Sequence, residues 1–318
     1  MFPVRRIFLA LLSGLCCLPA MALTPATDDE ILRQFMWQRF VDLPKGARPK
    51  IGLALSAGGV RGFAHVGVLE VFDNARVPVD YLAGTSMGSV VGGFYAAGLP
   101  IDELWELGEH ITLKTITPDF NVMGLFRFLF AHKLPTSANL AKFFEEHLGN
   151  KQIEELAIPF SCSAMDIKTG ERVVFNSGPL AIAVRASMNL PGVFEPVEYR
   201  HRALVDGAVL DYLPVDSVKN LGADYIIASV TPLDFSSKTP SSILGYVARV
   251  SDVRAAAMIE EESKNADFVI TNRVLDTGTL ELKKLHQAGE VGVKEAYRNL
   301  PALQEDILLE MLPYVFKK

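Results

Sequence analysis

The sequence predicts an α/β protein built as a three-layer α/β/α arrangement with a mostly parallel central sheet. Short apolar runs, each long enough for a buried strand, alternate with stretches of helical periodicity along most of the chain. The runs at residues 50–56 and 225–230 are apolar almost throughout, as strands covered by helices on both faces are. With 318 residues, of which 49% are hydrophobic and 21% charged, the chain can bury a large core.

The overall charge and the histidine content argue against two classes of function. A net charge of −6 at pH 7 provides no basic surface of the kind that binds nucleic acid, so no nucleic-acid partner is expected. The 6 histidines are scattered, and no two have the spacing of metal ligands, so no metal site is predicted.

The first 22 residues have the pattern of a secretory signal peptide. Arg5 and Arg6 precede an apolar run at residues 7–18, which is too short to be a good membrane span. Ala20-Met21-Ala22 matches an A-x-A cleavage site. These features predict export, to a bacterial periplasm.

Two cysteines in this segment, Cys16 and Cys17, raise the alternative of a lipoprotein. A lipobox requires a small residue just before its cysteine, whereas Leu15 and Cys16 occupy those places, so lipid anchoring is the weaker interpretation. If cleavage follows Ala22, Cys162 is the remaining cysteine and no intramolecular disulfide can form.

Residues 23–50 are predicted to be an N-terminal extension that ends in a Gly- and Pro-containing linker. Within it, residues 28–41 are expected to form a short amphipathic helix with the apolar side chains Ile31, Leu32, Phe35, Met36, Trp37 and Phe40. This helix could pack on the domain or touch a membrane surface. Packing is the favoured interpretation, because apolar stripes of this length usually belong to a core.

A glycine-rich loop follows the first clear strand and leads into a helix at about residues 63–75. The loop consists of Ala57, Gly58, Gly59, Val60, Arg61 and Gly62. Backbone N–H groups at such a strand-to-helix turn suit an anion, but neither G-x-G-x-x-G nor G-x-x-x-x-G-K-[ST] fits here. The loop is therefore either an oxyanion hole for a nucleophile on the next strand or a tight turn without chemistry.

The next strand, residues 79–83, leads into a match to G-x-S-x-G formed by Gly84, Thr85, Ser86, Met87 and Gly88. The residues from Ser86 to Ala97 are predicted to form a helix that Gly98 closes. Ser86 would then lie where a strand turns sharply into a helix, with the first N–H groups of that helix beside it. The pattern is short enough to occur by chance, and a serine nucleophile also needs a base and oxyanion donors.

The later elements continue the alternation. A helix at residues 101–110 precedes an aromatic-rich stretch at residues 115–133, which is either an apolar acyl channel over the site or an ordinary helical insertion. Ser137 is a candidate N-cap of the next helix. The remaining expected elements are a helix at 137–148, a hairpin at 160–175, helices at 180–188, 214–221, 242–266 and beyond 272, and strands at 196–199, 203–205, 225–230 and 268–271.

Two arrangements could supply a base to Ser86. In a triad of the order Ser…Asp…His the partners would be Asp206 and His286, although His286 lies in a Lys- and Glu-rich helical stretch without a loop signal. In a dyad the Asp206 carboxylate accepts the proton directly, because partial burial at a strand end raises its proton affinity. Asp206 can also be an ordinary turn aspartate before Gly207. His65, on the helix after the glycine loop, is expected to point into neighbouring packing.

Four segments in order resemble the patatin-like phospholipase family in its bacterial branch. Residues 58–62 resemble the oxyanion-hole motif G-G-G-x-R/K-G, and residues 84–88 resemble the nucleophile elbow. Arg185-Ala186-Ser187 with residues 190–194 resembles the next block, and Asp206-Gly207-Ala208 resembles the D-G-[GA] motif. Ala57 departs from the pattern, since it stands where the first glycine would be and narrows the freedom of the backbone.

The resemblance implies a patatin-like fold over residues 51–271, with residues 272–318 as a helical region packed on the same domain. It implies Ser86 as nucleophile, Asp206 as general base, an oxyanion hole in the 58–62 loop, no metal and no cofactor. The implied reaction is hydrolysis of the acyl esters of lipids through an acyl-enzyme, with a transient membrane-surface contact allowed and no protein partner indicated. The alternatives are a histidine-triad hydrolase that uses His286 and a non-catalytic lipid-binding protein of the same fold.

The signal-peptide assignment predicts that the mature protein begins near Leu23, because cleavage is expected after Ala22. Intact-mass measurement of the protein isolated from the producing cells tests this start site. A chain that retains Met1 would contradict export, and a diacylated cysteine would support lipid anchoring instead.

Overall fold

A single sheet forms the centre of the part of the chain that the structure, a computed structural model, describes: residues 27–110, 134–233, 235, 243–278, 281–312 and 314. The predicted signal peptide and the aromatic-rich stretch at residues 115–133 lie outside the described residues. The strands are β1 (Ile51–Leu55), β2 (Tyr81–Thr85), β3 (Phe160–Asp166), β4 (Arg172–Phe175), β5 (Val197–Tyr199), β6 (Arg202–Asp206), β7 (Tyr225–Val230) and β8 (Phe268–Thr271).

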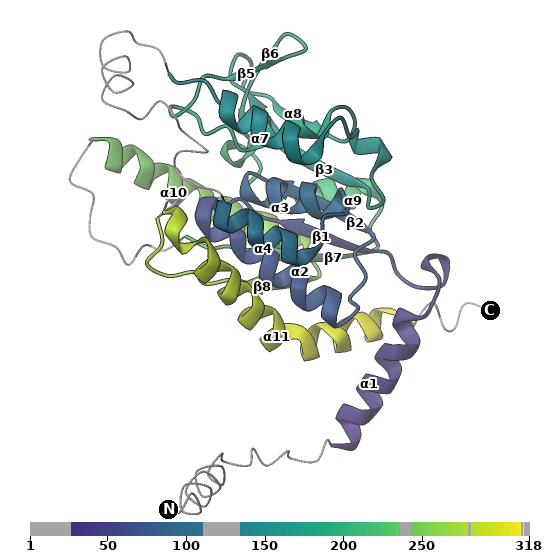
Figure 1. Cartoon of the computed structure of the whole chain (residues 1–318). Helices are drawn as coiled ribbons and strands as arrows, with labels where there is room; N and C mark the ends of the chain where they lie inside the picture. Colours follow the sequence, from purple (N-terminus) through teal and green to yellow (C-terminus); the bar gives the residue numbers. More distant parts are fainter. Residues whose placement is uncertain are drawn as a thin grey trace, which may run out of the picture.

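The strand order is β5-β6-β3-β2-β1-β7-β8, and β4 pairs with β3 (Figure 1). The five strands from β3 to β8 in this order are parallel, whereas β4, β5 and β6 pair antiparallel at one side. The mostly parallel sheet predicted from the apolar runs is therefore confirmed, and the antiparallel part comes from the predicted hairpin and the short strands after it.

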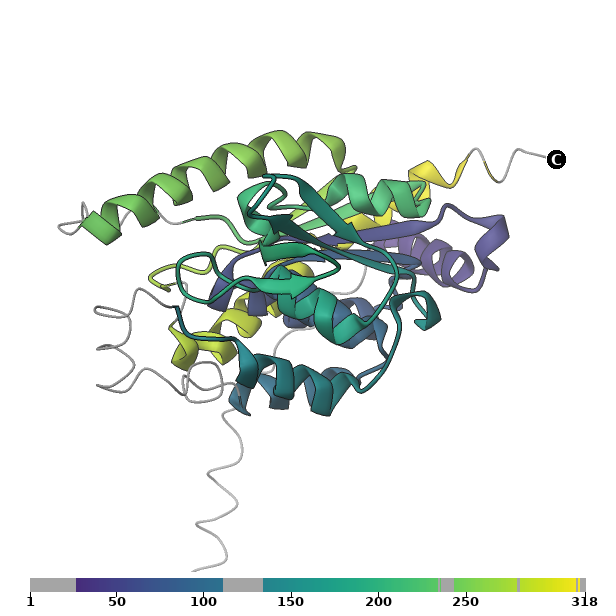
Figure 2. The same ribbon diagram turned by 90° about the horizontal axis from the view of Figure 1, so that it is seen from above.

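Helices cover both faces of the sheet (Figure 2). They are α1 (Asp28–Val41), α2 (Ala64–Asn74), α3 (Met87–Ala96), α4 (Ile101–His110), α7 (Ala138–Leu148), α8 (Leu180–Ser187), α9 (Val215–Leu221), α10 (Ile243–Glu262) and α11 (Leu285–Glu310). Short 3₁₀ turns include η3 (Gly59–Phe63) and η5 (Gly207–Val209). Leu53 and Leu82 face the larger core under α2, α3, α8 and α11, and Ala54 and Ala83 face the core under α9 and α10.

The long helix α11 packs along α2, which follows the glycine-rich loop. The two helices approach so closely that a Cβ on Gly292 would lie 1.9 Å from the carbonyl oxygen of Ala64. Only glycine fits there, and the contact holds the start of α2 in place from outside. Helix α11, which carries none of the four motifs, thus supports the helix that follows the glycine-rich loop.

Helix α1 corrects one expectation. Its start is fixed by a capping box between Thr27 and Glu30, and Trp37 and Phe40 are buried against the core. Ile31, Leu32 and Phe35, in contrast, are more than half exposed, because only the second half of the helix reaches the domain. The packing interpretation is right for the second half of α1 and wrong for the first.

Two smaller expectations also change. Ser137 stands at the N-cap position of α7 but makes no capping bond, since its Oγ accepts a hydrogen bond from Arg185 Nε at 3.0 Å. The strand before the elbow runs over Tyr81–Thr85 rather than residues 79–83, because Asp80 turns back to bind the start of β1.

A buried ion pair joins the beginnings of β1 and β2. Arg48 donates two hydrogen bonds to the carboxylate of Asp80, at 2.6 and 3.1 Å, and the Ile51 N–H donates a third at 2.9 Å. Burial alone would raise the pKa of Asp80, but these donors outweigh it and leave that pKa below its ordinary value.

Replacement of Arg48 tests the weight of this pair. Arg48→Met leaves a buried carboxylate without its main partner, so we expect the free energy of unfolding to fall by about 3 kcal/mol in urea titrations. The matched control is Arg76→Met, which removes an exposed pair with Asp42 (N–O distance 2.8 Å) and should cost less than about 1 kcal/mol. Equal losses in the two variants would contradict a structural role for the buried pair.

Candidate active site

Ser86 lies at a strained turn between β2 and α3. Its φ of 54° is one that L-residues rarely adopt, and its ψ is −123°. The flanking glycines allow this turn: a Cβ on Gly84 would lie 2.2 Å from the Gly88 carbonyl oxygen, and one on Gly88 would lie 2.4 Å from the Leu55 carbonyl oxygen. Both fixed glycines of G-x-S-x-G are thus required by close backbone contacts, and the predicted strand–turn–helix context is present.

Asp206 is brought to Ser86 by the change of strand direction in the sheet. Strand β3 runs parallel to β2, with Ser163 beside Thr85, and antiparallel to β6, with Ala164 beside Asp206. The end of β2 and the end of β6 therefore meet on either side of β3. The Ser86 hydroxyl donates a hydrogen bond of 2.6 Å to Asp206 Oδ2, and both side chains are buried.

Burial raises the pKa of the Asp206 carboxyl from an ordinary 3.8 to about 6, although the hydrogen bonds donated by Ser86 and by the Ala208 N–H act in the opposite direction. The carboxylate is ionised above about pH 6 and then points its charge at the serine hydroxyl. Such a carboxylate is a much stronger base than an exposed aspartate.

The glycine-rich loop lies against the start of α3. A Cβ on Gly62 would be 2.7 Å from the Cβ of Met87, and one on Gly58 would be 2.2 Å from Thr231 Oγ1. Gly59 has a φ of 55°, a left-handed conformation that suits glycine. The first N–H groups of η3 and of α3 have no partner within their own helices and so can bind an anion.

Ala57, the departure from the glycine motif, fits the loop without strain. Its φ is not positive, its N–H donates to the Tyr212 carbonyl oxygen at 2.8 Å, and its methyl group packs against Tyr212 and Ala255. The doubt that a methyl group here raises about the shape of the loop therefore finds no support in the backbone.

Several supporting residues were not predicted. Ser187 Oγ accepts a hydrogen bond from the Ser86 N–H at 3.0 Å. Asp211 accepts from the buried Ser163 hydroxyl and pairs with Arg172, and Glu262 accepts from the Leu213 N–H at 2.7 Å. They hold the elbow and the segment after Asp206. The only sequence signal was the position of Ser187 in a family motif block, and the others have none.

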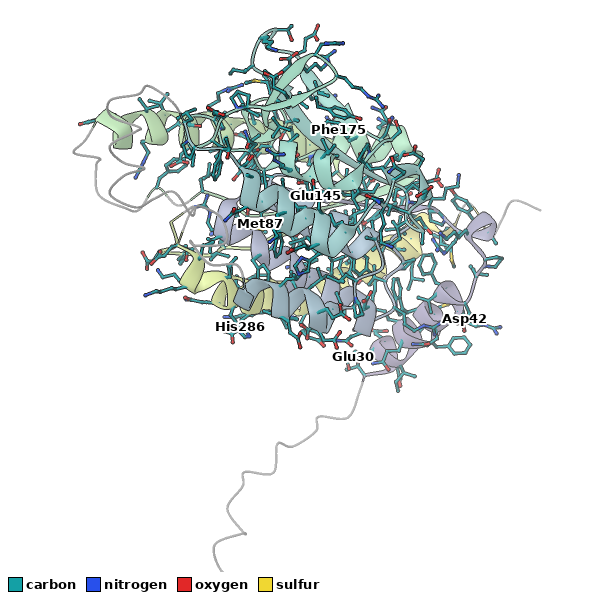
Figure 3. The ribbon with its side chains drawn as sticks, turned by 45° about the horizontal axis from the view of Figure 1, so that its top comes forward. Glu30, Asp42, Met87, Glu145, Phe175 and His286 are labelled. Carbon is teal, nitrogen blue, oxygen red and sulfur yellow. The ribbon has the colours of Figure 1, made fainter. Side chains whose placement is uncertain are left out.

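The two histidines named from the sequence lie away from the serine hydroxyl. His65 is buried beneath the glycine loop, where Nε2 donates to the Ser56 carbonyl oxygen at 2.9 Å and Nδ1 accepts from Ser229 Oγ at 2.8 Å. Burial lowers the pKa of His65 to about 4, so its ring is neutral. His286 is 59% exposed on α11, where it pairs with Glu290 and its ring lies 4.9 Å from that of Trp105 at a tilt of 44°. Figure 3 shows His286 apart from Met87, the neighbour of Ser86 in the chain.

Two further observations concern the surroundings of the serine. An apolar cavity lies beside Met87 between α3, α4 and α7, with Phe63, Val90 and Phe143 in its wall. Among the described residues, no three His, Cys, Asp or Glu side chains come together as a metal site requires.

The fold and the turn at Ser86 define a class, namely α/β proteins with a G-x-S-x-G serine at a sharp strand-to-helix turn. The family model for patatin-like phospholipase matches residues 53–219, which is more than half of the chain. The chain belongs to the patatin-like phospholipase family.

Curated proteins with similar sequences carry the NTE name. An uncharacterized NTE family protein of Mycobacterium tuberculosis is 38% identical over 184 residues, which are 57% of this chain and 48% of that protein. Lysophospholipase NTE1 of Scheffersomyces stipitis is 33% identical over 277 residues, 77% of this chain and 18% of that protein. The chain thus spans about half of the length of the mycobacterial relative and less of the yeast one.

Solved structures with a related arrangement are more distant. Human GIVD cytosolic phospholipase A2 is 13% identical with a TM-score of 0.48, covering 90% of this chain and 65% of that one. VipD from Legionella pneumophila is 12% identical with a TM-score of 0.45, covering 80% and 67%.

The raised pKa of Asp206 predicts a pH-dependent gain in stability on replacement. Between about pH 4 and pH 6 the folded protein holds a proton that the unfolded chain has lost, so the free energy of unfolding falls as the pH rises through this window. In Asp206→Asn this loss is absent, while the amide can still accept from Ala208 and donate to Ser86. We expect the free energy of unfolding of the variant, relative to that of wild type, to be higher at pH 8 than at pH 4 by on the order of 2–3 kcal/mol.

Urea titrations of wild type and Asp206→Asn at the two pH values measure this difference. The control is Glu305→Gln, which makes the same carboxylate-to-amide change at an exposed position on α11. A constant difference between Asp206→Asn and wild type at both pH values would contradict a desolvated carboxylate.

Proposed function

We propose that the protein is a lipid acyl hydrolase that cleaves carboxylic esters with Ser86 as nucleophile and Asp206 as general base. The observation that carries the proposal is the 2.6 Å hydrogen bond from Ser86 Oγ to a buried carboxylate whose pKa burial raises to about 6. Family membership supports the same chemistry. The proposal needs no histidine at the serine.

In the acylation step, Asp206 takes the hydroxyl proton as Ser86 Oγ attacks the ester carbonyl carbon. The resulting oxyanion would be held by N–H groups of the glycine loop, at Gly59 and Val60, with the Met87 N–H as a further donor. When the carbon–oxygen bond to the leaving group breaks, the alcohol departs with the proton from Asp206. The acyl group remains on Ser86 as an ester.

Deacylation repeats these steps with water. Asp206 takes a proton from the water as its oxygen attacks the acyl-enzyme carbonyl carbon, and the same N–H groups hold the second oxyanion. The bond to Ser86 then breaks, Ser86 recovers the proton from Asp206, and the fatty acid leaves. Asp206 is therefore ionised again at the end of each cycle and can act as the base in the next one.

A lipid substrate suits the apolar surroundings of the serine. The small cavity beside Met87 is lined by apolar side chains from α2, α3, α4 and α7. The name of the Scheffersomyces stipitis relative, a lysophospholipase, supports the same substrate class. The two alternatives have weaker support: His286 is exposed and paired with Glu290, and a purely lipid-binding protein has no need of the strained serine or its carboxylate.

The dyad predicts which replacements abolish activity. Ser86→Ala removes the nucleophile, and Asp206→Asn cannot accept a proton at neutral pH, so each should lower kcat/KM on a soluble p-nitrophenyl ester by at least ~10²–10⁴-fold. The double variant should be little worse than either single one, because the two groups act as one unit.

His286→Ala is the matched control for this series and should retain most of the activity. Circular dichroism establishes that each variant is folded. A folded, inactive His286→Ala would favour the triad, and a folded Asp206→Asn with near wild-type turnover would rule out the dyad. A wild-type protein with no esterase or phospholipase activity on a panel of lipids would leave lipid binding as the function.

The pKa of Asp206 also predicts the pH dependence of the rate. Because the ionised form is the base, kcat/KM should be flat above pH 7 and fall about tenfold per pH unit below about pH 6. Stopped assays on one soluble ester between pH 4.5 and pH 8.5 give the profile. A profile that remains flat down to pH 4.5 would be inconsistent with Asp206 as the base.

A further inference from the structure

Helix α10 carries an apolar stripe on its exposed face. Tyr246, Val247, Val250 and Val253 are each more than half exposed, and their spacing places them on one side of the helix. Large apolar side chains that stand alone on a surface need no explanation, but a contiguous group marks a contact site. We call these four side chains the α10 stripe. Toward the end of the helix the same face becomes acidic, at Glu260 and Glu261.

The stripe lies at the same end of the molecule as the candidate active site. Farther along the helix, Ala255 packs with Ala57 and Tyr212, and Asp252 faces Arg61 of the glycine loop. Tyr246 is nine residues before Ala255, a rise of about 13 Å toward the helix N-terminus. Figures 1 and 2 both show this first part of α10 projecting beyond the other coloured elements on the side where β1 and β2 end.

Other exposed apolar side chains lie on the loops that follow the strands at this edge of the sheet. Phe235 follows β7 and Leu275 follows β8, and both are exposed. Leu275 is tied to the site, because Thr277, two residues on, accepts a hydrogen bond from Arg61 at 3.1 Å. The ring of Phe235 lies 5.6 Å from the guanidinium of Arg249 on α10. Phe235 thus lies against α10 beside the stripe, and Leu275 belongs to the loop that binds Arg61.

The composition of this surface matches that of a helix that lies in a lipid interface. Such helices combine aliphatic and aromatic side chains with arginines that reach the headgroups, and tyrosine is frequent at headgroup depth. Arg249 and Arg254 accompany the stripe. Of the acidic residues of α10, Asp252 faces Arg61 of the glycine loop, and Glu260, Glu261 and Glu262 lie at the far end of the helix. None of the described helices is both long and apolar enough to cross a bilayer.

We propose that the α10 stripe docks the protein on the surface of an anionic lipid bilayer, with the edge that carries Ser86 and the glycine loop turned toward the lipid. The inference rests on the proposed function, because a lipid substrate is what gives this orientation its purpose. Docking would place the stripe in the headgroup region and shorten the path of an ester from the bilayer to Ser86.

The test separates binding from hydrolysis by use of the inactive Ser86→Ala background. Flotation with vesicles of 30% phosphatidylglycerol and 70% phosphatidylcholine measures the bound fraction. Tyr246→Ser, Val247→Ser and Val250→Ser together should lower the partition coefficient at least about tenfold, since three apolar side chains no longer enter the interface. Val253→Ser alone, the mildest change, should give a smaller loss in the same direction.

The matched control uses another group of exposed apolar side chains, on α1. Ile31→Ser, Leu32→Ser and Phe35→Ser remove as many exposed apolar side chains from the opposite side of the molecule and should leave vesicle binding within about twofold. Equal loss of binding in the two triple variants, or unchanged binding in the α10 variant, would overturn the proposal.

An activity measurement completes the test. With Ser86 intact, the α10 variant should hydrolyse a soluble short-chain ester at the wild-type rate but act about tenfold more slowly on phospholipid in vesicles. Failure of the proposed function is distinguishable, because wild type would then hydrolyse neither substrate while its vesicle binding could still be measured. Light scattering supplies the remaining outcome: a dimer that the α10 substitutions dissociate, with vesicle binding unchanged, would assign the stripe to a second copy of the chain instead.

Discussion

The hydrogen bond between the Ser86 hydroxyl and the Asp206 carboxylate is the contact on which the rest of this structure depends. It requires a buried carboxylate, which is costly unless it is hydrogen-bonded, and a serine in a conformation that costs free energy by itself. Strand β3 sets the spacing of the two residues by pairing parallel with one strand and antiparallel with the other. The close backbone contacts of Gly84 and Gly88 then restrict the conformation of the turn at Ser86.

Elements outside the four motifs secure this geometry. Helix α11 presses Gly292 against the start of α2, and Thr277, after β8, holds Arg61 of the glycine loop. Helix α10 contributes Glu262, which binds the segment that follows Asp206. The family model ends at residue 219, whereas all three of these supports lie beyond it. The candidate site is therefore a property of the whole described domain.

Much of the fold and the positions that meet in the candidate site could be predicted because their signals are local. A buried parallel strand must be apolar, so β7 and β8 were located to the residue, and a sharp strand-to-helix turn needs glycines at fixed spacing around Ser86. The supports could not be predicted, because the partners of Ser187, Asp211 and Glu262 are chosen by tertiary contacts between distant segments. The exposure of Ile31, Leu32 and Phe35 was missed for the same reason: their periodicity is that of a packed helix, and the distance of the helix from the domain decides their burial.

Covalent labelling of Ser86 with a fluorophosphonate tests the central claim most directly. In the proposed mechanism Ser86 Oγ attacks phosphorus, fluoride leaves, and Asp206 takes the proton, so the labelling tests the proposed nucleophile and base without requiring a particular lipid. Peptide mass spectrometry should locate the adduct on Ser86, with a labelling rate that falls at least ~10²-fold in Asp206→Asn and stays at the wild-type value in His286→Ala. Rapid labelling of Ser86 in Asp206→Asn, or an adduct on another residue, would contradict the account.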